Sequence, residues 1–160
     1  MDEQELQKEI NKTKKYLANM EKLLDECKYK RWKPKDGKIY WYLTGSLDIW
    51  VSDTLSLSNY ETYNCFQTEK QAKAEAEKIL VRRMLEDIAR KLNKGQKIDW
   101  SLTEQTKYYI AYDTVEKGLY CSYNHYNQIA GVVYCVDMNF CKVAIEKIGE
   151  QRLKKYLRGE

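Results

Sequence analysis

The chain has 160 residues, and its 28 lysines and arginines against 24 aspartates and glutamates give a net charge of +4. This length allows one compact domain, or two very small ones, with a core that needs no covalent staples, and the charge is too small to indicate a nucleic-acid-binding protein by itself. No run approaches the ~18 apolar residues of a membrane-spanning helix, and the acidic start (Asp2, Glu3, Glu5) is unlike a signal peptide. We therefore expect a cytoplasmic protein that contacts no membrane.

The cysteines form an odd set without a paired short spacing: Cys27, Cys65, Cys121, Cys135 and Cys141. In a chain without a signal peptide, this usage favours reduced cysteines that pack as small apolar residues. A disulfide framework is not expected.

Residues 1–31 are predicted to form one helix, because helix formers dominate and neither glycine nor proline interrupts them. Spacings of four and three residues alternate along one stripe, as in a coiled coil: Leu6, Ile10, Thr13, Leu17, Met20, Leu24 and Cys27. The candidate oligomerisation residues are the five large apolar members: Leu6, Ile10, Leu17, Met20 and Leu24.

Two arrangements of this stripe stay open. In a parallel homodimer, Glu9 and Lys14 make one favourable interhelical pair. The next flanking positions, Tyr16 and Leu23, carry no charge, and this is tolerated when a helix packs on its own sheet or in an antiparallel bundle.

A first unit is predicted at residues 38–92, after a turn at Asp36-Gly37. β-branched and aromatic residues alternate with polar ones in several short runs. These runs are Ile39–Leu43, Leu47–Ser52, Leu55–Ser58 and Thr62–Phe66. We expect them to form a small antiparallel meander.

A long helix follows the meander. Thr68 is its predicted N-cap, and Asn93-Lys94-Gly95 is expected to end it. Its buried stripe is predicted to contain Ala72, Ala76, Ile79, Leu80, Met84, Ile88 and Leu92.

A second unit, predicted at residues 107–157, repeats this order. Sliding the chain by 69 residues aligns residues 38–80 with residues 107–149 without a gap. Thr68 then falls on Asp137, an equally good N-cap, and the apolar positions of the two helices coincide.

These predictions make the fold class α+β: a long N-terminal helix plus two tandem antiparallel β-meander–α repeats packed as one body. Two or three strands and one helix cannot bury a core alone, so the two units are expected to pack together. Residues 94–106 join them, with Trp100 as the expected anchor, and Gly149 is expected to break the last helix.

Four motifs carry a resemblance to a known group of proteins. They are Trp32-x-Pro34-x-x-Gly37-x-x-Tyr40-Trp41-Tyr42, Asn64-Cys65-Phe66-x-Thr68-Glu69-x-x-Ala72, Lys107-Tyr108-Tyr109-Ile110-x-Tyr112-Asp113 and Ala144-Ile145-Glu146-x-Ile148-Gly149-Glu150-x-x-Leu153-Lys154-Lys155-Tyr156-Leu157. Together with the N-terminal helix, nearly the whole chain resembles small uncharacterised proteins of phages and prophages of low-GC Gram-positive bacteria. The chain departs from that group at Cys135-Val136-Asp137, where an aromatic residue and Ser or Thr are common. The resemblance implies a phage origin, the host cytoplasm and a fold, but it supplies no activity.

Little in the sequence indicates an enzyme. The single histidine, His125, follows Cys121 by four residues, which on a strand separates them by about 13 Å. A zinc site needs three or four ligands, and no Cys-x-x-Cys or second histidine supplies them. The carboxylates near predicted strand ends lack the Asp/Glu-x-Lys arrangement of a metal-dependent nuclease; they are Asp48, Asp53, Asp113 and Glu116. We therefore expect no catalysis, no metal and no cofactor.

Basic and aromatic side chains interleave after the first helix. The candidate nucleic-acid-binding residues are Lys28, Lys30, Arg31, Trp32, Lys33, Lys35 and Lys38. Cations for phosphates beside stacking rings suit single-stranded nucleic acid. Cations at a helix C-terminus also complement the helix dipole, and Trp32 can equally hold the helix against the sheet, so both interpretations stay open.

Tyrosine is the commonest aromatic residue, and eleven of the 14 tyrosines lie between Tyr40 and Tyr134. Six are candidates to face outward and bind a protein: Tyr42, Tyr60, Tyr63, Tyr120, Tyr123 and Tyr126. Tyrosine gives a large contact area at low entropic cost, which suits protein recognition. A role as half-buried filler of the sheets is equally consistent with the pattern.

From these observations we expect a non-catalytic accessory protein that binds a host protein. The resemblance to phage proteins points to a host defence system, such as a CRISPR nuclease, so an anti-CRISPR role is the working hypothesis. The alternative is a nucleic-acid-binding accessory protein that uses the basic and aromatic segment of residues 28–41.

Overall fold

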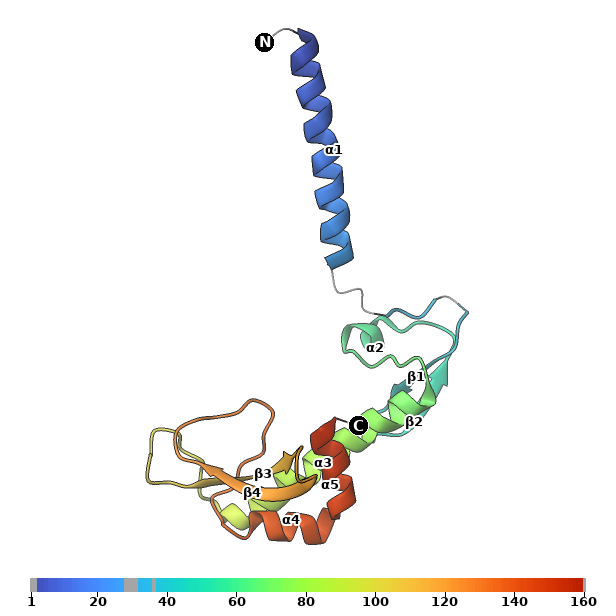
Figure 1. The fold of residues 1–160 in the computed structure, drawn as a ribbon. Coiled ribbons are helices and arrows are strands. Elements are labelled where there is room, and N and C mark those ends of the chain that lie inside the picture. Colours follow the sequence, from blue (N-terminus) through green and yellow to red (C-terminus); the bar gives the residue numbers. More distant parts are fainter. Residues whose placement is uncertain (1–2, 28–31, 36, 160) are drawn as a thin grey trace. The chain divides into compact units, whose positions relative to one another are not determined.

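The computed structural model describes residues 3–27, 32–35 and 37–159, and within the first range the side chains of residues 5–21. The elements follow in the order α1 (Glu3–Cys27), β1 (Tyr40–Leu43), β2 (Ile49–Ser52), α2 (Leu57–Glu61), α3 (Glu69–Asn93), β3 (Lys107–Asp113), β4 (Gly118–Asn124), α4 (Phe140–Ile148) and α5 (Glu150–Arg158) (Figure 1). The fold is α+β, as predicted: an N-terminal helix and two antiparallel two-stranded hairpins, whose helices pack together in one body.

The chain divides into two compact parts: residues 1–33, which contain α1, and residues 34–160, which contain both predicted units. Four of the five candidate oligomerisation residues have described side chains, and they are 39–55% exposed: Leu6, Ile10, Leu17 and Met20. The fifth, Leu24, lies outside the described side chains. Among the described residues, no helix has the length and apolar character needed to cross a membrane.

The first unit contains a hairpin and one bridging residue where a meander was predicted. Strands β1 and β2 pair in antiparallel register, and Phe66 adds an isolated bridge by exchanging two backbone hydrogen bonds with Trp41. The strand predicted at Leu55–Ser58 is wrong, since α2 begins there. Ser56 Oγ accepts a hydrogen bond from the Asn59 amide and caps that helix, a local preference that a two-residue alternation cannot outweigh.

Two side chains replace the missing strand pairing around β1. The Tyr40 ring is buried, and its hydroxyl donates to the Thr54 carbonyl at 3.2 Å and accepts from the Ser56 amide at 3.1 Å. The Asn64 side chain accepts from the Leu43 amide at 2.7 Å and donates to the Leu43 carbonyl at 2.6 Å, as a neighbouring strand would. These bonds satisfy backbone groups that burial would otherwise leave unpaired.

Helix α3 begins and ends at the predicted residues. Thr68 Oγ1 accepts a hydrogen bond from the Gln71 amide, and the Gln71 side chain accepts one from the Thr68 amide, both at 3.2 Å. This reciprocal arrangement is a capping box. At the other end, Lys94 adopts a left-handed conformation with φ of 48° directly after Asn93.

The buried face of α3 differs in part from the predicted stripe. Ala72 and Ile88 are buried as predicted, whereas Leu80 is exposed. The other buried positions are Val81, Leu85 and Ala89. The helix carries apolar residues on two adjacent faces, and contact with α4 and α5 determines which face becomes the core.

The second unit repeats the first with a different spacing. Cys135 forms an isolated bridge with Tyr108, as Phe66 does with Trp41. Phe66 and Cys135 are 69 residues apart, but Trp41 and Tyr108 are 67 apart, so the gapless alignment fails in the strands. The N-cap predicted at Asp137 is also wrong. The N-cap of α4 is Asn139, and the Asp137 carboxylate instead accepts from the Asn139 amide at 2.8 Å in the preceding turn.

The main core lies between the C-terminal half of α3 and the second unit. It joins eleven buried residues: Val81, Leu85, Ile88, Ala89, Ile110, Cys135, Phe140, Cys141, Ala144, Ile148 and Leu153. Gly149, with φ of 94°, separates α4 from α5 as predicted, and this bend places Leu153 of α5 in the core.

A buried lysine closes the linker between the two units. Lys107 is fully buried, and its Nζ donates to the carbonyls of Leu102 at 2.8 Å and His125 at 2.7 Å. The same ammonium group lies 5.2 Å from the ring centroid of Trp100, whose ring packs edge-on against Tyr134. Trp100 therefore anchors the linker, as predicted.

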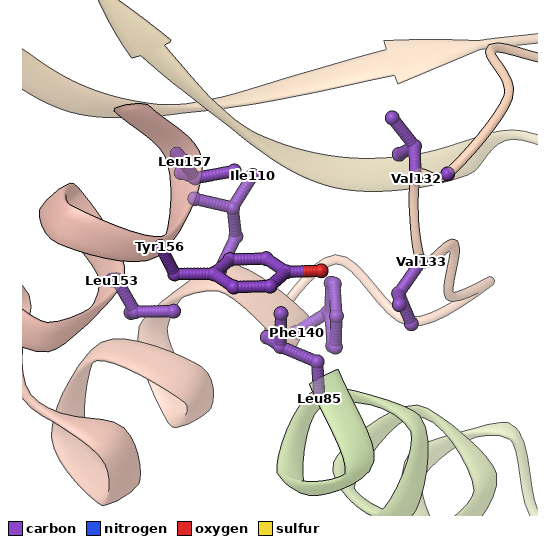
Figure 2. A pocket seen from close by; sticks show the side chains of 9 residues that line it. Leu85, Ile110, Val132, Val133, Phe140, Leu153, Tyr156 and Leu157 are labelled. Atoms are coloured by element: carbon purple, nitrogen blue, oxygen red, sulfur yellow. The ribbon is translucent and has the colours of Figure 1, made fainter. Parts of the chain in front are cut away.

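An apolar cavity of about 50 Å³ remains at the edge of the core. Figure 2 shows the Tyr156 ring among its lining residues, with the hydroxyl directed toward the space beside Val132 and Val133. That hydroxyl makes no hydrogen bond within the part of the chain that the structure describes, and burial raises the pKa of Tyr156.

Tyr40, whose hydroxyl makes two hydrogen bonds, and Tyr156 give a matched test of the packing. Tyr40→Phe removes a buried hydroxyl and leaves the Thr54 carbonyl and the Ser56 amide without it, so it should lower the free energy of unfolding by about 1–3 kcal/mol. Tyr156→Phe removes a hydroxyl without a hydrogen-bond partner and should change it by no more than about 0.5 kcal/mol. Urea unfolding followed by circular dichroism measures both, and equal losses would contradict the arrangement.

Candidate protein-binding surface

The six predicted tyrosines divide between the two units, and their exposure differs. Tyr42, Tyr60 and Tyr63 belong to the first unit, where the first two are half-buried and Tyr63 is exposed. Tyr120, Tyr123 and Tyr126 belong to the second unit, and all three are exposed. The second unit therefore provides most of the exposed tyrosine surface.

Strand alternation separates two of these three rings. Tyr123 pairs with Tyr108 across the hairpin, whereas Tyr120 pairs with Ala111. Because successive residues of a strand point to opposite faces, Tyr120 and Tyr123 lie on opposite faces of β4. Sequence alone placed them in one set, and the register shows that they cannot act on one surface.

Tyr108, Tyr123 and His125 form a cluster of rings, and together with the next residue, Tyr126, we call them the tyrosine patch. The Tyr123 ring lies 6.3 Å from the Tyr108 ring and 5.6 Å from the His125 ring. Tyr126 directly follows His125 along the chain and is 69% exposed. The patch thus combines packed rings at its base with an exposed ring at its rim.

Lys107 fixes the chain beneath this patch. Its Nζ holds the His125 carbonyl, so the backbone directly after β4 is tied to the start of β3. This role of Lys107 was not predicted, since a lysine at the start of a strand is usually solvated. Within the described residues, His125 Nδ1 is buried without a hydrogen-bond partner.

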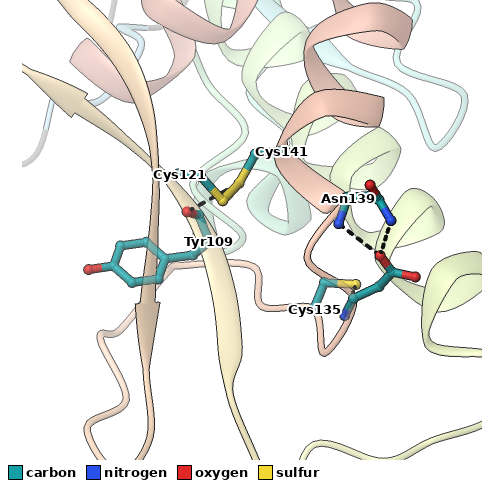
Figure 3. The surroundings of a disulfide bond; sticks show 6 residues. Tyr109, Cys121, Cys135, Asn139 and Cys141 are labelled. Carbon is teal, nitrogen blue, oxygen red and sulfur yellow. Dashed lines mark hydrogen bonds between the residues drawn. A yellow bond between two sulfur atoms is a disulfide. The ribbon is translucent and has the colours of Figure 1, made fainter.

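The structure contradicts the expectation that all the cysteines are reduced. Cys121 and Cys141 form a disulfide with a Cα–Cα distance of 5.7 Å, and it joins β4 to α4 (Figure 3). The pair lies beside the Tyr109 carbonyl. Two cysteines 20 residues apart come together because α4 packs against the hairpin, a contact that no short sequence spacing reveals.

This disulfide also affects Cys121 and His125, the one cysteine–histidine pair whose spacing the sequence analysis considered. While Cys121 is bonded to Cys141, it has no thiol to act with His125. Cys135 is buried, its Sγ lies 3.0 Å from Asn93 Oδ1, and burial raises the pKa of its thiol. A buried thiol with a raised pKa is a poor nucleophile.

The carboxylates near strand ends have roles in turns. Asp113 Oδ1 accepts hydrogen bonds from the amides of Val115 at 2.8 Å and Glu116 at 3.0 Å, in the turn between β3 and β4. Asp48 accepts from Ser46 Oγ at 2.6 Å in the turn of the first hairpin. No group of three metal-ligating side chains occurs among the residues that the structure describes.

The candidate nucleic-acid-binding segment is only partly described. Lys28, Lys30 and Arg31 lie outside the described residues. Of the remaining members, Trp32 is half-buried, whereas Lys33, Lys35 and Lys38 are exposed. Nucleic-acid binding by this segment stays a prediction.

Comparison with family models, curated proteins and solved structures finds no match. The resemblance to phage and prophage proteins therefore stays a prediction.

The disulfide gives a direct test of this region. Closing a loop of 20 residues should stabilise the chain by about 3 kcal/mol, so dithiothreitol should lower the stability of the wild type by about that amount. Cys121→Ser should be equally destabilised without reductant and insensitive to it. Cys65→Ser, which leaves the disulfide intact, serves as the matched control and should still respond. Chemical unfolding with and without reductant measures these differences, and a wild type insensitive to dithiothreitol would contradict the bond.

Proposed function

We propose that this chain is a non-catalytic accessory protein that binds another protein through the tyrosine patch. The observation that carries the proposal is the exposure of Tyr123 and Tyr126 above a base that ring packing and Lys107 hold in place. Tyrosines on such a base lose little conformational entropy on binding, which is the property that makes them frequent hot spots.

The patch suits a protein better than a small charged ligand. Its members are rings with hydroxyl or imidazole groups, and Ile129, three residues after Tyr126 in the sequence, is an exposed apolar residue. Aromatic centres rimmed by polar groups are typical of protein interfaces. A host defence protein, such as a CRISPR nuclease, is the partner class that the resemblance to phage proteins implies.

The three exposed tyrosines of the second unit allow an internally controlled experiment. The protein is immobilised, and proteins retained from a nuclease-treated lysate of a low-GC Gram-positive host are identified and purified. Tyr123→Ala and Tyr126→Ala should each weaken binding of the purified partner by about 1–2 kcal/mol, roughly 5- to 30-fold in Kd. Tyr120→Ala, on the opposite face of the same strand, should leave Kd within about twofold.

Salt dependence and nuclease sensitivity distinguish protein binding from the alternative function, nucleic-acid binding. Binding through rings should change little between low and high salt, because apolar contacts are not screened. Equal losses for Tyr120→Ala and Tyr123→Ala would contradict the patch. Retention that disappears after nuclease treatment would instead favour the nucleic-acid-binding function.

Helix α1 adds a second element to the proposal, a homodimer. Leu6, Ile10, Leu17 and Met20 form an exposed apolar stripe that a second copy would bury. The polar member of the stripe fits this role, because Thr13 Oγ1 donates to the Glu9 carbonyl at 2.9 Å within its own helix. Its hydroxyl is therefore already satisfied and can be buried.

A pair of substitutions to aspartate tests the homodimer. Leu17→Asp places a charge in the stripe and should convert a dimer to a monomer in light scattering at micromolar concentration. Ala18→Asp adds the same charge to the adjacent exposed face of α1 and should leave the mass unchanged. A wild type with the mass of one chain would contradict self-association.

A further inference from the structure

Helices α3 and α5 enclose a cationic pocket of about 290 Å³. Its charged lining consists of Lys70, Lys73, Lys78, Arg152 and Lys155, with Glu77 as the single carboxylate. Five positive charges and one negative charge give this pocket a net charge of +4, equal to the net charge of the whole chain. The mild overall charge therefore hides a strong local one.

Internal pairing accounts for three of the five cations. Arg152 donates from Nε and Nη2 to the two carboxylate oxygens of Glu77, which fastens α5 to α3. The guanidinium holds the pKa of Glu77 below its ordinary value, so this carboxylate stays ionised and engaged with Arg152. Lys73 pairs with Glu69 at 2.7 Å, and Lys78 Nζ donates to the Gly159 carbonyl at 2.7 Å.

The other two cations, Lys70 and Lys155, are in no salt bridge among the described residues, although the charge of Lys155 helps to lower the pKa of Glu77. They come from different helices and line the same pocket. The Glu77–Arg152 bridge joins those helices, so both lysines border one space. An anion placed there gains from both and displaces no internal contact.

We propose that this pocket binds phosphate groups, a site separate from the tyrosine patch. A phosphate carries more charge than one carboxylate and offers several acceptor oxygens to converging ammonium groups. Lys73 and Lys78 keep their own partners, so the phosphate is expected beside Lys70 and Lys155. It can belong to a small phosphate compound or to the backbone of a nucleic-acid strand.

Two double variants with the same charge change test the site. Lys70→Glu/Lys155→Glu reverses the two unpaired pocket lysines, whereas Lys97→Glu/Lys142→Glu reverses two exposed lysines outside it. The probes are a fluorescein-labelled single-stranded oligodeoxynucleotide, followed by anisotropy, and inorganic pyrophosphate, followed by calorimetry. The pocket variant should bind at least about tenfold more weakly, and the control variant should differ from wild type by no more than about threefold. For the oligonucleotide, the slope of log K against log salt should fall by about 1.4, since each lost contact to a single strand removes about 0.7.

The two probes identify the source of the phosphate. Pocket-dependent binding of the oligonucleotide alone assigns the site to a nucleic-acid backbone, and pocket-dependent binding of both probes assigns it to phosphate compounds in general. Failure of both probes to bind, equal weakening by the two double variants, or equally tight binding of polyglutamate would overturn the proposal. Circular dichroism spectra of the variants confirm folding, which exposed lysines are not expected to disturb.

Discussion

The two hairpins depend on one shared support, helix α3. A two-stranded hairpin is only marginally stable in water, and both hairpins here have two strands and one bridging residue. Helix α3 contacts β1 and β2 in the first unit and α4 and α5 in the second. Its 25 residues make it about 37 Å long, so it can serve both units at different positions along its length. The two repeats form one body because they share this helix.

Polar side chains at the ends of this support determine where the loops lie. Asn64, shortly before α3, pairs with both backbone groups of Leu43, and Asn93, its last residue, accepts from the Val136 amide at 2.9 Å. Lys107 does the same for the linker and for the segment after β4. Each side chain completes the hydrogen bonds of a backbone that lacks a neighbouring strand. The hydrogen bond from Lys107 to the His125 carbonyl, at the base of the tyrosine patch, is one example.

Most features of α3 that neighbouring residues set were predictable, whereas α2 with its Ser56 cap and the N-cap of α4 were not, and features set by distant contacts were missed. Thr68, Gln71 and Lys94 define α3 through hydrogen bonds and backbone angles that lie within a few residues, and Gly149 acts in the same local way. The disulfide, in contrast, depends on α4 packing against β4. The separation of Tyr120 from Tyr123 depends on hairpin register. Apolar spacing along α3 is compatible with either of two faces being buried. Val81 rather than Leu80 lies in the core because α4 and α5 pack on the face that contains Val81.

The distribution of charged residues shows most clearly that the sequence alone does not reveal contacts between distant residues. Lysines and arginines in the sequence indicated a basic segment at residues 28–38, because six of them are close together along the chain. The pocket between α3 and α5 draws its cations from residues about 80 positions apart, and acidic residues between them dilute the pattern. The Glu77–Arg152 pair engages the one carboxylate in the lining with two hydrogen bonds, and Lys70 and Lys155 line the same pocket outside any salt bridge among the described residues. The salt bridge and the two lysines come together only when α5 packs against α3. The sequence contains these residues, but their spacing along the chain does not indicate that they share one pocket.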